Sequence, residues 1–128
     1  MREAPVRKIL IVEDYEDTRL MMRLELEARG YRVVEAPDGE EAVRVAWREC
    51  PNIILMDLSL PKIDGFEAAR RIREDEQMRD VLIVAVTAHQ EPLYRANALE
   101  TGLNAFVTKP IDFDWLDELL KSLVQGRD

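Results

Sequence analysis

The sequence predicts an open, doubly wound α/β domain, with a five-stranded parallel sheet and five helices packed on its two faces. Short segments that are apolar along most of their length alternate with longer segments in which apolar residues recur every three or four positions. This alternation is typical of a parallel sheet that is covered on both faces. The chain has 128 residues, which suits one domain and is too short for the eight repeats of a closed barrel. We therefore expect a single domain over residues 1–128, with its core at about 7–124.

The five expected strands differ in polarity. They are placed at Lys8–Val12, Tyr31–Glu35, Ile53–Met56, Val81–Val86 and Ala105–Val107. The first, third and fourth are apolar almost throughout, which is typical of central strands. Arg32 and Glu35 interrupt the second strand and Asn104 precedes the fifth, so we expect these two strands at the edges of the sheet.

The five helices are expected near residues 15–29, 39–49, 65–76, 91–102 and from 113 onward. In the first, Leu20, Leu24 and Ala28 recur at helical spacing and are expected to face the core. In the second, Trp47 lies on a similar stripe and is expected to be buried. Asp112 is expected to cap the last helix, because an aspartate at this position accepts a hydrogen bond from a free backbone amide.

Composition excludes several classes of protein. Eighteen basic against 26 acidic residues give a net charge of −8, which argues against direct nucleic-acid binding. The apolar run Val81–Val86 is far shorter than the roughly 20 residues needed to cross a bilayer, and the polar start offers no signal peptide, so we expect a cytoplasmic protein that does not bind membranes. With Cys50 and His89 alone of their kinds, we expect no disulfide or zinc site, and any metal to be oxygen-bound. The charged residues within 70–76 are expected to form a solvated helix face.

Polar residues follow four of the expected strands: Glu13, Asp14, Asp57, Thr87 and Lys109. In open parallel sheets, ligands bind in the crevice outside the carboxyl ends of the strands. A single acidic residue in such a loop is most often a helix cap. Five chemically matched residues at one edge of the sheet instead indicate a functional site.

The chemistry of these side chains favours a metal and a phosphoryl group. Three carboxylates within about 5–7 Å repel one another by a few kcal/mol, and Lys109 offsets one charge. A hard divalent cation would cancel the rest, which suits Mg²⁺, with Mn²⁺ as a substitute. A phosphoryl group would meet Lys109 as a cation, the Thr87 hydroxyl as a donor and Asp57 as a carboxylate nucleophile. His89 lies two residues beyond Thr87 and is either a general base or, more commonly for such a position, an exposed loop residue.

Together, these residues resemble the receiver domain of response regulators in two-component signalling. The motifs that carry the resemblance are Val12-Glu13-Asp14, Met56-Asp57-Leu58-Ser59-Leu60-Pro61 with Asp64-Gly65, Thr87-Ala88 and Lys109-Pro110. The similarity covers about 7–124, and four separate loops agree in spacing. It implies a flavodoxin-like sheet of strand order 2-1-3-4-5. It also implies a phosphoprotein of a phosphorelay that is not an enzyme in the ordinary sense, although it catalyses its own phosphorylation and dephosphorylation.

The resemblance assigns roles to the residues of the crevice. Asp57 is the phospho-acceptor, and Asp14 and Asp57 bind Mg²⁺ together with the backbone carbonyl of Ser59. Glu13 acts on the metal mainly through water. Lys109 holds the phosphoryl oxygens.

Further roles follow from the same resemblance. Thr87 and the backbone amide of Ala88 bind the phosphoryl group. Thr87 and Phe106 form the switch, and Phe106 stands where the family often has a tyrosine. Ser59 and His89 occupy the positions that tune dephosphorylation.

The expected partners are proteins. A histidine kinase or a phosphotransfer protein supplies the phosphoryl group. No residues remain after the fifth helix for an output domain, so we expect a stand-alone regulator that passes the group on or binds a target when phosphorylated. The target surface is expected on the fourth helix, fifth strand and fifth helix, at Tyr94, Phe106 and Trp115.

Two alternatives remain open. An aspartate-nucleophile phosphatase shares the acceptor, but that class commonly has a second acid two residues on, where this chain has Ser59. A phosphorylation-independent interaction module would need no intact crevice, and the complete set of site residues disfavours it. A flavin site and a nucleotide kinase are excluded by the acidic first loop and by the absence of the glycine-rich phosphate loop.

Overall fold

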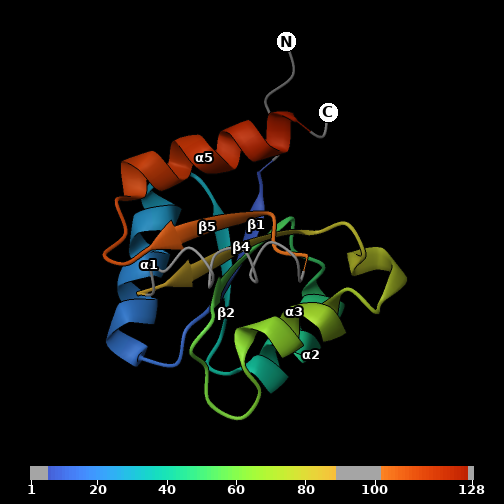
Figure 1. Ribbon diagram of the computed structural model, residues 1–128. Helices are drawn as coiled ribbons and strands as arrows, with labels where there is room; N and C mark the ends of the chain where they lie inside the picture. Colours follow the sequence, from blue (N-terminus) through green and yellow to red (C-terminus); the bar gives the residue numbers. More distant parts are fainter. Residues whose placement is uncertain (1–5, 89–101, 127–128) are drawn as a thin grey trace.

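The computed structural model describes residues 6–88 and 102–126. Its parallel strands are β1 (Lys8–Val12), β2 (Arg32–Ala36), β3 (Ile53–Asp57), β4 (Leu82–Thr87) and β5 (Ala105–Thr108). They form one sheet (Figure 1), and its strand order is β2-β1-β3-β4-β5. The predicted strand order is confirmed, and β2 and β5 are the edges as expected.

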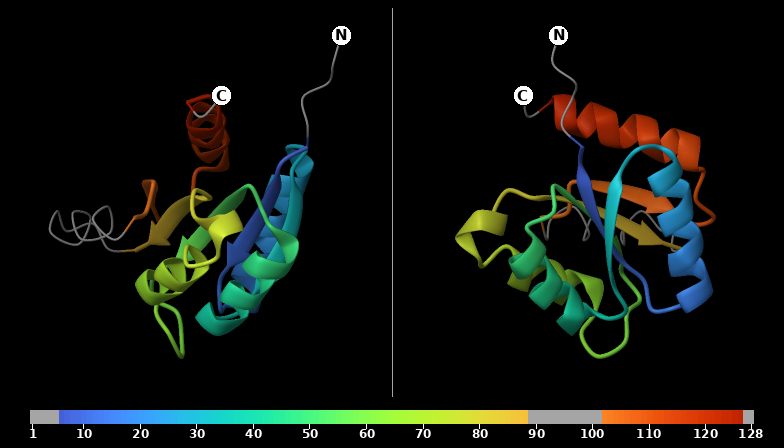
Figure 2. Two further views of the ribbon diagram at one scale, coloured as in Figure 1. Left: turned by 90° about the vertical axis from the view of Figure 1, so that its right-hand side faces the viewer. Right: turned by 180° about the vertical axis from the view of Figure 1, so that it is seen from behind.

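The described helices are α1 (Glu16–Ala28), α2 (Gly39–Glu49), α3 (Gly65–Ile72) and α5 (Phe113–Gln125), together with a 3-10 turn, η1 (Glu76–Met78). Helices α1 and α5 cover one face of the sheet, and α2 and α3 cover the other (Figure 2). The helix expected near 91–102 lies outside the described residues. The predicted cap of α5 is confirmed, because Asp112 Oδ1 accepts a hydrogen bond from the amide of Trp115 at 3.1 Å. Within the described ranges, we find no helix with the length and apolarity needed to span a membrane.

The core has two halves, one on each side of the sheet. Leu10 and Ile54 pack toward α2 and α3. Their neighbours Ile9 and Ile53 pack toward α1 and α5, because successive strand residues point to opposite faces. All four side chains are fully buried. Burial of such a side chain contributes about 1.5–3 kcal/mol relative to exposure, so the two halves hold the sheet firmly between its helix layers.

The strand register brings the carboxyl ends of the strands to one edge. Parallel pairing aligns Asp57 with Val86, and Thr87 with Thr108. The loops after β1, β3, β4 and β5 therefore open on the same side of the sheet. This is the edge at which the sequence predicted a crevice.

The predicted core stripe of α1 is wrong. Leu20 and Leu24 are 52% and 58% exposed, and Ala28 is exposed as well. The buried residues of this helix are Met22 and Leu26. Both pairs have the four-residue spacing of a helix face, so the local pattern does not decide between them, and the sheet selects the pair that faces it. The first stripe is left as an exposed apolar surface.

The prediction that Trp47 is buried is also wrong. Its side chain is 43% exposed, and its indole nitrogen donates a hydrogen bond to the carbonyl of Ile72 at 3.2 Å. Its neighbours Val43 and Ala46 are buried, so the core stripe ends one position short of the indole. Trp47 therefore lies over the end of α3, with its indole N–H hydrogen-bonded, as is common for tryptophan.

Helix α3 ends at Ile72, four residues earlier than predicted. The chain then turns, and the guanidinium of the next residue, Arg73, binds several distant groups. It donates to the carbonyls of Arg79, Val81 and Gly102 at 2.8, 2.8 and 2.7 Å, and to Asn104 Oδ1 at 2.9 Å. Arg73 thus joins α3 to the starts of β4 and β5, and the prediction that it belongs to a solvated helix face is wrong.

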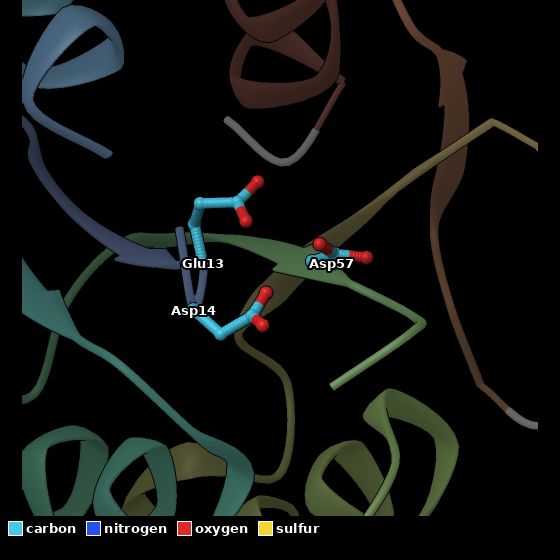
Figure 3. Close-up of side chains that lie close together, drawn as sticks. All are labelled: Glu13, Asp14 and Asp57. Carbon is cyan, nitrogen blue, oxygen red and sulfur yellow. The ribbon is translucent and has the colours of Figure 1, made fainter. Parts of the chain in front are cut away.

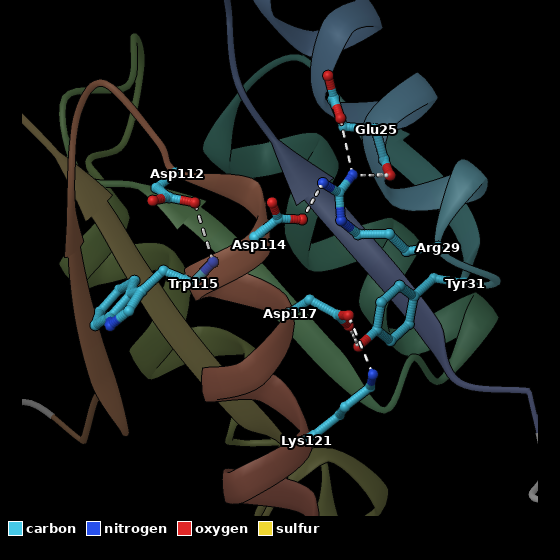
Figure 4. Close-up of polar contacts among 8 residues, drawn as sticks. All are labelled: Glu25, Arg29, Tyr31, Asp112, Asp114, Trp115, Asp117 and Lys121. Carbon is cyan, nitrogen blue, oxygen red and sulfur yellow. Dashed lines mark hydrogen bonds and ion pairs between the residues drawn. The ribbon is translucent and has the colours of Figure 1, made fainter.

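Helix α5 has two different sides (Figure 4). On one side, Asp114 accepts from Arg29 at 2.8 Å and Asp117 accepts from the hydroxyl of Tyr31 at 2.5 Å. These contacts tie α5 to the end of α1 and the start of β2. Trp115 projects from the other side of the helix and is 51% exposed.

Candidate metal and phosphoryl site

Three carboxylates converge at the predicted edge of the sheet (Figure 3). Glu13 and Asp14 follow β1, and Asp57 is the last residue of β3. One oxygen from each lies within 4.8 Å of the others. Glu13 and Asp57 are only 3% and 5% exposed, whereas Asp14 is exposed. The predicted acidic cluster therefore forms, with two buried members and one that opens to solvent.

Backbone amides of the neighbouring loops orient the two buried carboxylates. Glu13 Oε2 accepts from the amide of Tyr15 at 3.1 Å, and Asp57 Oδ1 accepts from the amide of Ser59 at 2.9 Å. Hydrogen bonds of this kind stabilise the charged form of a carboxylate. The two side chains are thus fixed before any ligand binds.

Lys109 follows β5 and enters this cluster. Its Nζ lies 3.0 Å from Glu13 Oε1 and 3.2 Å from Asp57 Oδ2. Burial alone would lower the pKa of Lys109, but the hydrogen bond to Glu13 and the charge of Asp57 outweigh burial, and the pKa is raised. Lys109 therefore stays charged and is shared between two acids.

This sharing leaves the cluster short of positive charge. Within the described ranges, the ammonium group of Lys109 contacts two of the three carboxylates, Glu13 and Asp57. Burial raises the pKa of Glu13, and the charge of Asp57 raises it further, against the lowering effect of the Tyr15 amide and Lys109. A raised pKa marks an acid whose charge is costly in the metal-free protein. The carboxylate oxygens converge, and their negative charge is only partly neutralised. Such a group suits a hard divalent cation such as Mg²⁺.

The residues after β4 lie beside this cluster. Thr87 is the last residue of β4 and is 1% exposed, and Ala88 is exposed. The strand pairing places Thr87 one residue beyond the partner of Asp57. The predicted hydroxyl donor is therefore the last residue of the strand next to the acceptor, and the predicted amide donor follows it directly. His89 lies outside the described residues.

The predicted switch and target residues are partly described. Phe106 on β5 pairs with Ala85 and is 9% exposed, packed into the core half that faces α2 and α3. Phe106 and Trp115 line one pocket of about 390 Å³. Tyr94 lies outside the described residues, so the aromatic pair predicted with Trp115 is not tested.

One residue that supports the site was not predicted from the sequence. Arg19 on α1 donates from Nη1 to the backbone carbonyl of Glu13 at 2.9 Å, and its Nε lies 3.3 Å from Glu35 Oε1. Arg23, one turn later, also binds Glu35, at 2.6 Å. An arginine six residues after an acid gives no recognisable signal, because the contact depends on how α1 packs against β2.

An apolar surface beside the crevice was not predicted from the sequence either. A pocket of about 510 Å³ is lined by Lys109, Pro110 and Phe113 together with Thr18 and Met21 of α1, and by Ile111. Met21 also lines an adjoining pocket of about 430 Å³ that includes the exposed Leu20 and Leu24. The wrongly predicted stripe of α1 is thus part of a surface that reaches the site lysine.

The fold and the site together define a class of protein, the phospho-accepting domains of signal transduction. The chain belongs to the response regulator receiver domain family, whose model matches residues 9–121. The family resemblance predicted from four loops is therefore confirmed.

Several relatives illustrate this membership. The chain is 34% identical over 119 residues to the alkaline phosphatase synthesis transcriptional regulatory protein PhoP of Bacillus subtilis, over 93% of this chain and 49% of PhoP. It is 36% identical over 118 residues to the response regulator PleD of Caulobacter vibrioides, over 92% of this chain and 26% of PleD. The chain thus spans about half or less of the length of these curated relatives.

Solved structures agree with the fold. The receiver domain of the sensor histidine kinase PA1611 of Pseudomonas aeruginosa PAO1 matches with a TM-score of 0.85 at 38% identity, over 92% of this chain and 97% of that one. That structure has a magnesium ion coordinated in its active site cleft. The chemotaxis protein CheY4 of Vibrio cholerae matches with a TM-score of 0.87 at 27% identity, over 92% of this chain and 98% of that one.

Proposed function

We propose that this domain accepts a phosphoryl group on Asp57 from a histidine kinase or a phosphotransfer protein, in a reaction that requires Mg²⁺. The observation that carries the proposal is the position of Asp57. Its carboxylate is 5% exposed, lies within 4.8 Å of oxygens of Glu13 and Asp14, and is 3.2 Å from Lys109 Nζ. A carboxylate held in this way is a preoriented nucleophile.

Each residue of the crevice has a separate role in the phosphoryl transfer. An Oδ atom of Asp57 forms a bond to phosphorus as the bond from phosphorus to the donor's imidazole nitrogen breaks, and the imidazole leaves with the bonding pair. Lys109 exchanges a carboxylate contact for a phosphoryl oxygen. The hydroxyl of Thr87 and the amide of Ala88 donate hydrogen bonds to the remaining oxygens.

Mg²⁺ is held in this proposal by Asp14, Asp57 and the backbone carbonyl of Ser59, with Glu13 acting indirectly. The cation supplies charge neutralisation for the incoming phosphoryl oxygens, and Mn²⁺ would substitute for it. The magnesium ion in the cleft of the PA1611 receiver domain supports this assignment. The shortage of positive charge around Glu13 supports it independently.

We further propose that the phosphodonor protein docks on α1. Leu20, Met21 and Leu24 are 52%, 48% and 58% exposed. The pocket that Met21 shares with Lys109 makes this surface continuous with the crevice. A donor whose histidine reaches Asp57 must cover the rim of the crevice, and exposed apolar side chains at such a rim are typical of an interaction surface.

The signal is proposed to leave through the surface around Phe106 and Trp115. Phosphorylation draws Thr87 toward the phosphoryl oxygens, and Phe106 turns into the space that Thr87 leaves. The exposed indole of Trp115 supports a target surface here, and the contribution of Tyr94 stays a prediction. The tuning of dephosphorylation by Ser59 and His89 stays a prediction as well.

Two further expectations concern the wider context of the domain. The net charge of −8 supports the absence of direct nucleic-acid binding by this domain. Its cytoplasmic location and its stand-alone organisation stay predictions, which the fractionation and mass of the native protein would test.

Intact-mass spectrometry after incubation with acetyl phosphate tests the proposed function. With Mg²⁺ we expect about one phosphoryl group per chain, and with a chelator none. The variant Asp57→Asn should take up none under either condition. The matched control is Asp64→Asn, because Asp64 accepts a bond from the amide of Glu67 outside the crevice and asparagine keeps that cap. Labelling that survives Asp57→Asn, or that needs no metal, would contradict the proposal.

A further inference from the structure

The loop between β3 and α3 rests on the beginning of α2. Lys62 Nζ lies 3.4 Å from Asp38 Oδ2. Next to this ion pair, Ile63 packs against Gly39 so closely that a Cβ on Gly39 would lie 2.6 Å from both the Cγ1 and the carbonyl oxygen of Ile63. The same loop carries Ser59, whose amide binds Asp57 Oδ1.

The backbone of this loop needs external support. Lys62 has a φ of 69°, in the left-handed region that side chains with a Cβ disfavour. Such a conformation persists only where the surrounding structure holds it. The contacts of Lys62 with Asp38 and of Ile63 with Gly39 are placed to do so.

The support itself is fixed in place. Asp38 caps α2, with Oδ1 accepting from the amide of Glu41 at 2.8 Å while Oδ2 faces Lys62. The capping bond lowers the pKa of Asp38, against the effect of burial, and Lys62 lowers it further. Gly39 is fully enclosed within the first turn of α2. Both residues therefore belong to a rigid helix terminus rather than to another loop.

The two ends of the loop are also fixed. At one end, the amide of Ser59 binds Asp57. At the other end, Gly65 starts α3 so close to β3 that a Cβ on it would lie 2.7 Å from the carbonyl oxygen of Asp57. Lys62 and Ile63 lie between these ends, so their contact with α2 determines the path of the backbone next to the acceptor.

We propose that Asp38 and Gly39 form a contact surface that holds the loop between β3 and α3. This surface, which we call the seat, positions the backbone of Ser59 for Mg²⁺ binding. The inference rests on the proposed function only for the role of Ser59. Neither Asp38 nor Gly39 contacts the acceptor, so both are positioning residues. The beginning of α2 thereby influences metal affinity through the path of the loop, without contacting the metal.

Limited proteolysis of the metal-free protein tests the seat itself. Trypsin binds its substrate as an extended segment, so the cut after Lys62 becomes faster when the loop leaves its compact path, and fragments 1–62 and 63–128 report this cut by mass. The variant Asp38→Asn keeps the helix cap and loses the charge, so this cut should become about two- to fivefold faster. The conservative variant Lys62→Arg keeps the ion pair and remains a trypsin site, so its rate should stay close to that of the parent.

The variant Gly39→Ala gives a larger effect. Alanine favours a helix more than glycine does, so any loosening comes from the collision with Ile63. We expect this cut to become roughly tenfold faster or more. The matched control is Gly126→Ala, where a Cβ would meet its nearest atoms at an ordinary 3.6 Å, and where the cut after Lys62 should be unchanged.

A second measurement separates positioning from general destabilisation. In both seat variants, the Mg²⁺ concentration that half-saturates phosphorylation by acetyl phosphate should rise about three- to tenfold, while the rate at saturating Mg²⁺ stays close to the parent. Parental cleavage rates and parental Mg²⁺ dependence in Asp38→Asn and Gly39→Ala would overturn the seat. Faster cleavage with unchanged Mg²⁺ dependence would overturn the positioning of Ser59. A parent protein that takes up no phosphoryl group would refute the proposed function, while the cleavage rates would still report on the seat.

Discussion

Two carboxylate clusters in this domain have opposite electrostatics. On the outer face of α3, Glu67 accepts from Arg70 at 3.0 and 2.6 Å and from Arg71 at 2.8 Å. The hydrogen bonds from Arg70 and then from Arg71 lower the pKa of Glu67 to about 2. Glu67 thus contacts two cations, one of which, Arg70, also pairs with Glu74 at 2.7 Å.

In the crevice, the acids outnumber their cation. Glu13 and Asp57 share Lys109, and burial raises the pKa of Glu13. In the α3 cluster, neighbouring arginines neutralise the carboxylate charge, so no ligand is needed. In the crevice, part of the carboxylate charge is not neutralised by the protein. An acidic cluster therefore indicates a metal site by its unmet charge and its burial, not by its number of acids.

The largest effect is expected where the unbalanced cluster loses its cation. In Lys109→Met, the rate of phosphorylation by acetyl phosphate with Mg²⁺ should fall about 10²- to 10³-fold, because one charged group that stabilises the transferred phosphoryl is gone. The matched control is Lys121→Met, since Lys121 pairs with Asp117 at 3.2 Å on α5 and is 66% exposed. A Lys109→Met rate near that of Lys121→Met would break the contrast between the two clusters.

A smaller effect is expected from the support behind Glu13. In Arg19→Gln, Mg²⁺ affinity measured by calorimetry should fall about tenfold, because the backbone next to Asp14 loses the contact that holds it. Arg23→Gln is the control, since Arg23 also binds Glu35 but its other described contact is with Glu27 rather than with Glu13. Equal affinities for the two variants would show that the bond to the Glu13 carbonyl does not matter.

The strand ends explain how much of this site the sequence could predict. The apolar runs place Asp57 and Thr87 at the ends of central strands, and parallel pairing then brings those ends to one edge whatever the details of packing. The edge that carries these residues was therefore predictable from the apolar runs, whereas the strand order was predicted from the family resemblance, and the acceptor role of Asp57 stays a prediction. Which face of α1 is buried, that of Leu20 or that of Met22, was not predictable from the sequence. Both faces have the same periodicity, and only packing against the sheet distinguishes them.

Contacts between distant segments were beyond the reach of local patterns. The charged residues around Arg73 predicted a solvated helix face. The chain instead turns after α3, and the carbonyls of Val81 and Gly102 lie within 2.8 Å of the Arg73 guanidinium. The seat of Lys62 on Asp38 is a contact of the same kind. Such contacts depend on where loops return to the domain, which no periodicity records.

The pH dependence of stability should differ between the clusters. An acid whose pKa is raised in the folded state stabilises the fold below its unfolded value and destabilises it as the pH rises through the folded value. Glu13 belongs to this case, so the metal-free protein should become less stable to urea as the pH rises above the ordinary glutamate value of 4.5. Glu13→Gln should reduce this decline, and saturating Mg²⁺ should suppress it. A decline of the same size in Glu13→Gln would assign it to other groups.

The smallest effect is expected at the satisfied cluster. The lowered pKa of Glu67 has the opposite sign, so its contribution is present above the ordinary value of 4.5 and is lost only as the pH falls toward about 2. Glu67→Gln should therefore leave the urea stability profile between about pH 5 and pH 8 parallel to that of the parent. Because exposed ion pairs contribute little, its melting temperature should lie within about 2 °C of the parent and its phosphorylation rate within about twofold. A Glu67→Gln protein with weakened Mg²⁺ dependence would mean that the α3 face communicates with the crevice, and burial would then no longer separate the two clusters.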